Sequence, residues 1–339
     1  MDRAAATKMS ILANELARMA GPACRETVLA ATKRWEEKIR ERVRLEMALK
    51  LADDSGAGRQ VQRVAVVISD GLPKALLAHE RDLTEELAEI AGMFRPDLLS
   101  FKEAAAALQL LLGRLGGLDP KWSEREKLEV PKIVELESLT AELLELAGHA
   151  TFTKKLKMID EDILGAYFPL GNKPKGGGPP VIEIYWTVIG AVAKAIQVDV
   201  EGLTLTVLTH ELAHAYSHLG ADTDGNRWAD HAFCVSEVFI KEGIAQYYTD
   251  KVVGWFQQRN LAAPSSAYTA LLRIQSPPYN IHKEWLEQFS PEIVRAALVE
   301  CRNNHVTKTE EFIELMNMAK HRLGRRSRLQ DTLFLESDS

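Results

Sequence analysis

The sequence has few of the features that would place a protein in an oxidising compartment or a membrane. Its three cysteines, Cys24, Cys234 and Cys301, are far apart and form no CxxC pair, which disfavours both a disulfide framework and a thiolate zinc site. No stretch approaches the roughly 20 apolar residues of a membrane-spanning helix. Residues 1–22 carry both charge signs and lack the apolar core of a signal peptide. We therefore expect a cytoplasmic protein with reduced cysteines and no membrane partner.

An excess of basic charge is also missing. The 42 Lys and Arg residues are outnumbered by 48 Asp and Glu residues, giving a net charge of −6. Proteins that bind nucleic acid usually present a basic surface field, so no nucleic-acid partner is predicted. What the chain does have is apolar content: 46% of its 339 residues are hydrophobic. That is enough to bury a sizeable core.

Helical patterns dominate the first part of the chain. Apolar residues recur every three to four positions over residues 10–51, with a break at "GPACRE". Further helical patterns, separated by "MFRP" and by the loop "GGLDPKWSEREKLEVP", cover residues 74–92, 96–115 and 131–147. "VAVVIS" at 64–69 is too short to be assigned by periodicity. We expect residues 1–147 to form a helical region, either a scaffold or a module that binds a regulatory protein or a protein substrate.

The pattern changes in the second part of the chain. "GAYFPL" and "PVIEIYW" are rich in β-branched and aromatic residues and flank a loop rich in glycine and lysine, which predicts a β-hairpin. Helical patterns follow at 188–196, 203–219 and 233–253. The predicted fold is therefore α+β and mainly helical, with a second domain at residues 148–325 and a C-terminal tail at 326–339.

The stretch "TVLTHELAHAYSHLG" carries the clearest chemical signal. His210 and His214 are four residues apart, so on a helix both imidazoles project from one face and can hold one ion. Glu211 lies about 100° round the helix, where its carboxylate reaches a water molecule on the ion without binding the ion itself. H-E-x-x-H on a helix is a known pattern of zinc hydrolases for this reason.

A catalytic zinc site needs a third protein ligand. Five downstream residues are candidates: His218, Asp230, His231, Glu237 and Glu242. His218 is disfavoured because three ligands along one straight helix cannot converge on one ion. We favour Glu242, because small residues after it, Gly243 and Ala245, would let its helix approach the histidine helix. Gln246 would then hydrogen-bond the outer nitrogen of a ligand histidine. Glu237 stays open as the alternative.

These residues resemble the gluzincin metallopeptidases, the family of thermolysin and the zinc aminopeptidases. The match is H-E-L-A-H at 210–214 followed by E-G-I-A-Q-Y at 242–247, and it covers about a quarter of the chain. The resemblance implies a zincin-like domain that binds one zinc ion per chain through His210, His214 and Glu242, with Glu211 as general base. The spacing of 27 residues between His214 and Glu242 is longer than is usual in the family.

The resemblance also implies a tyrosine or histidine that stabilises the transition state. No motif in this sequence identifies which residue that is. The candidates are Tyr247, Tyr248, His231, Tyr279 and His282.

A peptide or protein substrate is expected to pair with an edge strand above the zinc helix. Either strand of the hairpin is a candidate for that edge, and Gly165, Ala166 and Tyr167 are the substrate-binding residues if it is the first. In the zinc aminopeptidases the corresponding strand carries a glutamate that holds the free amine of the substrate, and "GAYF" lacks it. We therefore expect a selective endopeptidase. The alternatives are an aminopeptidase and a binding or regulatory protein that retains the fold without turnover.

Overall fold

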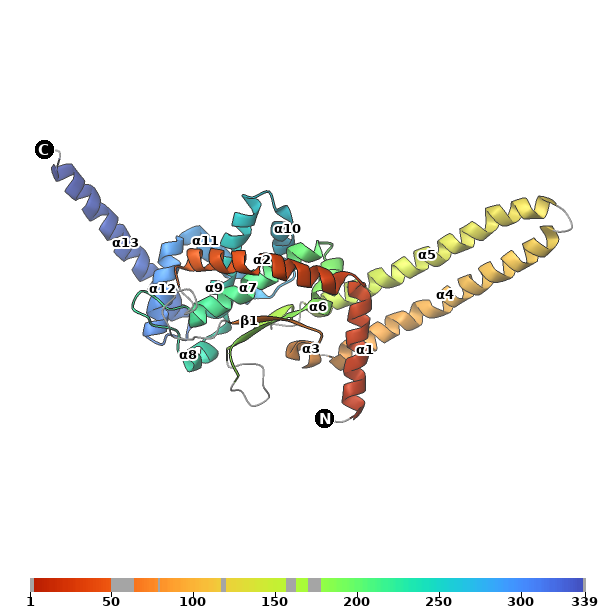
Figure 1. The fold of residues 1–339 in the computed structure, drawn as a ribbon, viewed down its shortest axis with the longest axis horizontal. Coiled ribbons are helices and arrows are strands. Elements are labelled where there is room, and N and C mark those ends of the chain that lie inside the picture. Colours follow the sequence, from red (N-terminus) through yellow and green to blue (C-terminus); the bar gives the residue numbers. More distant parts are fainter. Residues whose placement is uncertain are drawn as a thin grey trace.

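The computed structural model describes residues 3–49, 64–78, 80–116, 120–156, 163–169 and 178–337. They form a mostly helical body from which a long pair of helices projects (Figure 1). The body also contains a small three-stranded sheet, so the expected mainly helical α+β class is confirmed. Most of the glycine- and lysine-rich loop of the predicted hairpin lies outside the described residues.

The sheet consists of β1 (Ala65–Ser69), β2 (Gly165–Phe168) and β3 (Val181–Tyr185), in the order β1-β3-β2. β2 and β3 pair antiparallel as predicted, with Gly165 opposite Ile184. The unassigned segment "VAVVIS" supplies β1, which pairs parallel with β3. In the described sheet, β3 is therefore central and β2 is an edge strand, which decides between the two candidate edges.

The helix that carries the H-E-x-x-H residues lies at the centre of the body. This helix, α7 (Val200–Leu219), packs against α2 (Cys24–Met47) and α9 (Val238–Gln257). Buried Val28 of α2 belongs to the same hydrophobic core as Leu208 of α7. The core around α7 therefore includes residues from both sides of the predicted domain boundary at residue 147.

The other helices outside the projecting pair fall into two groups. Near the sheet and the N-terminus are α1 (Arg3–Ala20), α3 (Lys74–Ala78) and α6 (Trp186–Ala195). The others are α8 (Asp230–Val235), α10 (Ala262–Leu272), the 3-10 turn Pro277–Asn280, α11 (His282–Gln288), α12 (Pro291–Asn303) and α13 (Thr309–Ser337). The segment predicted as one helix at 233–253 is divided into α8 and α9, because the backbone is extended at Ser236 and Glu237. The backbone of α13 continues through most of the predicted tail.

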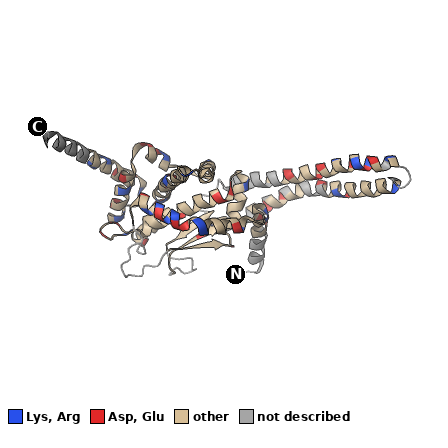
Figure 2. Ribbon diagram, turned by 45° about the horizontal axis from the view of Figure 1, so that its top comes forward, with Lys and Arg blue, Asp and Glu red and all other residues tan. Residues whose placement is uncertain are grey.

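The projecting pair consists of α4 (Glu80–Gly116) and α5 (Pro120–Leu156), packed along each other (Figure 1). The predicted breaks at "MFRP" and before Pro131 were wrong, since Pro96 and Pro131 both lie inside helices. A proline removes one backbone hydrogen bond, and the contacts with the antiparallel neighbour offset that loss. Acidic and basic residues are interspersed along this arm (Figure 2). No described helix is long and apolar enough to cross a membrane.

Candidate metal centre

Helix α7 is buried almost throughout, so its polar side chains need partners inside the protein. Asp199 caps its N-terminus by accepting a hydrogen bond from the backbone N–H of Gly202 at 2.7 Å. Thr204 and Thr209 donate their hydroxyls to carbonyls one turn earlier. These two threonines are therefore satisfied within the helix, whereas the buried side chains of His210, Glu211, His214 and His218 must be matched from other elements.

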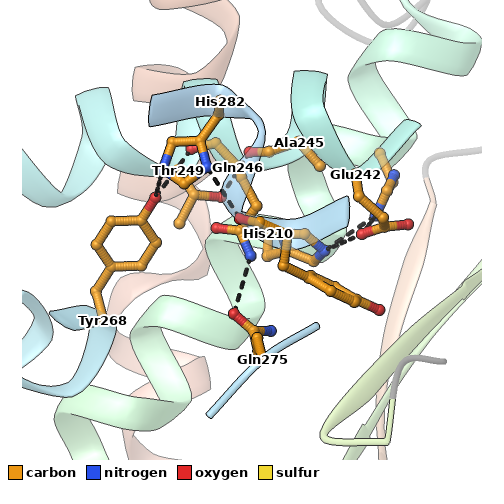
Figure 3. Close-up of polar contacts among 10 residues, drawn as sticks. His210, Glu242, Ala245, Gln246, Thr249, Tyr268, Gln275 and His282 are labelled. Atoms are coloured by element: carbon orange, nitrogen blue, oxygen red, sulfur yellow. Dashed lines mark hydrogen bonds and ion pairs between the residues drawn. The ribbon is translucent and has the colours of Figure 1, made fainter. Parts of the chain in front are cut away.

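Glu242 of α9 provides that match for His210 and His214. Its Oε2 atom lies 3.1 Å from Nε2 of His210 and 3.3 Å from Nε2 of His214, and the two Nε2 atoms are 3.0 Å apart. Figure 3 shows the approach of Glu242 to His210. All three side chains are buried. Within the described residues, they form a group that can hold a metal ion.

The dimensions of this triangle fit a small tetrahedral cation. Metal bonds of roughly 2.0–2.1 Å in a tetrahedron place neighbouring ligand atoms roughly 3.3 Å apart, close to the three observed separations. Two imidazoles and one carboxylate also suit a transition metal better than magnesium or calcium, which prefer oxygen ligands. The residues present therefore fit a bound metal ion in both donor type and spacing.

Glu242 is held in its charged form although it is buried. Burial raises the pKa of this carboxyl group, but the adjacent His214 and His210 lower it, and the net shift is downwards. An ionised carboxylate is the form that binds a cation.

The alternative third ligand, Glu237, is engaged elsewhere. Its carboxylate accepts hydrogen bonds from the backbone N–H and hydroxyl of Thr309, at 2.9 and 2.8 Å, and from Lys308 Nζ at 2.9 Å. The backbone N–H of Thr309, with help from Lys308, lowers the pKa of Glu237 to about 2. Glu237 therefore caps the start of α13, and Glu242 is the acidic residue that the structure brings to the histidines.

No protein-family model matches the chain, and no curated protein or solved structure is significantly similar to it. The interpretation of the site rests on its own residues and their arrangement.

The small residue after Glu242 has a different role from the one expected. A Cβ atom on Gly243 would lie 2.3 Å from Cη2 of Trp285 on α11 and 2.8 Å from Cγ2 of Ile281. Gly243 therefore accommodates the α11 side of the body and does not face α7. The approach of α9 to α7 comes from their packing in the shared core.

The edge strand β2 passes directly over Glu211. A Cβ atom on Gly165 would lie 2.8 Å from Cγ1 of Val207 and 2.9 Å from Cγ of Glu211. Only glycine fits at this distance without displacing the strand or the carboxylate side chain. The predicted substrate strand and the predicted general base are therefore neighbours in space.

A second contact joins β2 to α7. The hydroxyl of Tyr167 lies 2.8 Å from Nδ1 of His218, whose Nε2 lies 3.1 Å from Oδ1 of Asp230. The ring of His218 stacks on Phe233 with 4.4 Å between centroids. The sequence suggested His218 and Asp230 only as metal ligands, and nothing in the spacing indicated that they would meet Tyr167. His218 and Asp230 therefore support the edge strand through the hydroxyl of Tyr167.

Two of the five candidate transition-state stabilisers, Tyr247 and His282, are hydrogen-bonded elsewhere. Tyr247 donates its hydroxyl to the carbonyl of Phe289 at 3.1 Å, and Tyr248 is fully buried. His282 lies 2.9 Å from the hydroxyl of Tyr268 (Figure 3). Its other ring nitrogen lies 2.9 Å from the carbonyl oxygen of Tyr279. His231 is exposed on α8.

Tyr279 is the candidate that the structure places at the site. Its ring centroid lies 6.0 Å from that of His210, and it lines a cavity together with His210 and Glu211.

Gln246 was expected to orient a ligand histidine, and it does not. Its Nε2 instead donates to Oε1 of Gln275 at 3.4 Å (Figure 3). Both glutamines line the same cavity as Tyr279. Gln275 and the neighbouring Ser276 were missed from the sequence, because they lie in an irregular turn with no motif around them.

Proposed function

We propose that the protein is a zinc-dependent hydrolase of peptide bonds, with a zincin-like catalytic region. The observation that carries the proposal is the buried triangle of His210, His214 and Glu242 with Glu211 beside it under an edge strand. A purely structural role would explain the three mutual contacts but not the position of Glu211 next to β2. Zinc is the metal we assign, because two imidazoles, one carboxylate and one open position form a common catalytic zinc set.

Each residue then has a defined task in hydrolysis. Zinc, when bound, lowers the pKa of a water molecule and polarises the substrate carbonyl. Glu211 accepts the proton of the attacking water and transfers it to the leaving nitrogen. Its burial at 1% exposure keeps the carboxylate away from bulk water, where proton transfer would compete with solvent. Tyr279 is the side chain that would face the developing negative charge of the carbonyl oxygen.

The edge strand supplies the binding mode for the substrate. β2 has β3 on one side in the described sheet, so the backbone groups of its other side can pair with an extended peptide. None of its residues, Gly165–Phe168, carries a carboxylate that would hold a free amine. This favours cleavage within a chain over removal of its first residue.

Metal analysis combined with peptide cleavage tests this function. We expect about one zinc per chain in the wild type and in Glu211→Gln, and little in His214→Ala. Cleavage of internally quenched peptides is expected only in the wild type. Zinc binding without cleavage of any peptide would favour the alternative of a binding or regulatory protein, and cleavage confined to the first residue would favour an aminopeptidase.

A further inference from the structure

The cavity beside His210 and Glu211 has apolar walls. They are formed by Ile163, Leu164, Val192, Val207, Leu271 and Ile274. Its volume is about 60 Å³, whereas one water molecule needs roughly 10–15 Å³. The cavity therefore has room for a side chain of about four or five non-hydrogen atoms.

The cavity also contains buried polar groups that the protein leaves unsatisfied. Gln246 is only 2% exposed, and among the described residues its Oε1 atom and the hydroxyl of Ser276 have no hydrogen-bond partner. Both residues line the cavity. Buried polar atoms without partners are unfavourable. A ligand that brings a polar group to them therefore binds with a more favourable free energy than a ligand that is apolar throughout.

The charge of the lining excludes ionised ligands. Among the described residues that line the cavity, Glu211 is the only carboxylate, and none is Lys or Arg. A negatively charged side chain would lie beside the Glu211 carboxylate with no Lys or Arg of the described lining to pair with, and a lysine or arginine would compete for the proposed general base. The occupant should therefore be neutral.

The two glutamines define what kind of neutral group fits. The side-chain amides of Gln246 and Gln275 are hydrogen-bonded to each other (Figure 3). Whichever way the amides are turned, that bond leaves one carbonyl oxygen and three N–H groups for other partners. A ligand that both donates and accepts, as a carboxamide does, satisfies this set.

We propose that the cavity binds a glutamine side chain of the substrate next to the cleaved bond. This inference rests on the proposed function, since the cavity opens at the metal centre. A glutamine side chain has five non-hydrogen atoms, an apolar stem for the walls and a carboxamide for Gln246 and Ser276. Methionine has nearly the same length but would leave the buried polar atoms unsatisfied. Sites that hydrogen-bond their ligand reject apolar analogues strongly, and here we expect a preference of about 10- to 100-fold.

Peptide hydroxamates test the cavity without requiring turnover. A matched series carries glutamine, methionine or glutamate beside the metal-binding group, and the Kd of each is measured calorimetrically on zinc-loaded protein. Wild type should bind the glutamine compound about 10- to 100-fold more tightly than the methionine compound, and the glutamate compound more weakly than the glutamine one. This comparison needs no variant.

Two variants then assign the preference to the cavity. Gln246→Met should bring the ratio of the glutamine and methionine Kd values close to one, while zinc content is unchanged. Gln257→Met, the same change at an exposed position of α9, should leave the ratio as in wild type. Equal affinities in wild type, or a ratio unaffected by Gln246→Met, would overturn the cavity proposal and leave the peptidase proposal standing. A protein that takes up no zinc and binds no hydroxamate would overturn both.

Discussion

The hydroxyl of Tyr167 on β2 is hydrogen-bonded to Nδ1 of His218 on α7 at a distance of 2.8 Å. His218 is one turn beyond His214, and Tyr167 is two residues beyond Gly165, which contacts Glu211. The same strand and the same helix are therefore joined twice, once at the proposed base and once at this pair. The hydrogen bond fixes how the edge strand lies over the metal centre.

Tyr167→Phe should therefore reduce peptide cleavage without removing the metal. Loss of one buried hydrogen bond costs about 1 kcal/mol of stability, and we expect the looser strand to raise KM more than it lowers kcat. Steady-state kinetics and zinc analysis on the same sample measure both effects. A variant that loses its zinc would show that the pair supports the metal ligands and not the strand.

Gly165→Ala should impair activity more severely. The new Cβ atom would overlap Val207 and the Glu211 side chain, so either the strand or the base must move. We expect kcat/KM to fall at least about 10-fold, because misplacement of a reacting group by about 1 Å is costly. Gly254→Ala is the matched control, since a Cβ there meets no atom within 4 Å. Equal activity of the two variants would contradict the proposed closeness of strand and base.

Glu242→Gln and Glu237→Gln should separate the two acidic candidates. The first removes a charged ligand and should weaken zinc binding by at least about 10-fold. The second removes the cap of α13 and should lower the melting temperature while zinc affinity stays at the wild-type value. Competition with a chelator of known affinity measures both constants. The reverse pattern would assign the third ligand to Glu237.

Stability should fall on acidification through two buried histidines. Burial lowers the pKa of His218 and of His282 to about 4, against an unfolded value of about 6.5. Because the unfolded chain binds the extra protons first, stability is lost as the pH falls from about 6.5 to 4, by about 3 kcal/mol for each histidine. Urea unfolding across this range should show a shallower pH dependence for His282→Phe than for wild type. Identical slopes would contradict the lowered pKa of His282.

The sequence predicted those features of the site that depend on contacts between residues close together in the chain. The two ligand histidines and Glu211 lie within one regular helix, so helical periodicity was enough to predict that their side chains lie close together. The choice between Glu242 and Glu237 could not be decided in this way. It depends on the extended backbone at Ser236 and Glu237 and on the distant partner Thr309.

The long arm and the third strand show the same limit. Pro96 and Pro131 indicated helix ends, but packing between α4 and α5 keeps both helices continuous. "VAVVIS" became a strand only because β3, more than 100 residues later, offers it a partner. The cavity residues Gln275 and Ser276 had no local signal, because their role comes from the cavity that distant elements enclose with them.

The pairing of β1 with β3 also makes the sheet dependent on a contact between distant parts of the chain. Ala65 is opposite Val181, so closing the sheet brings together residues separated by the whole arm. A flexible loop of that length would make closure slow. The arm contacts are instead formed between neighbouring helices of one hairpin, which can assemble early and return the chain close to where it left. During synthesis, β3 and the helices that carry the metal group emerge only after the whole arm has been made.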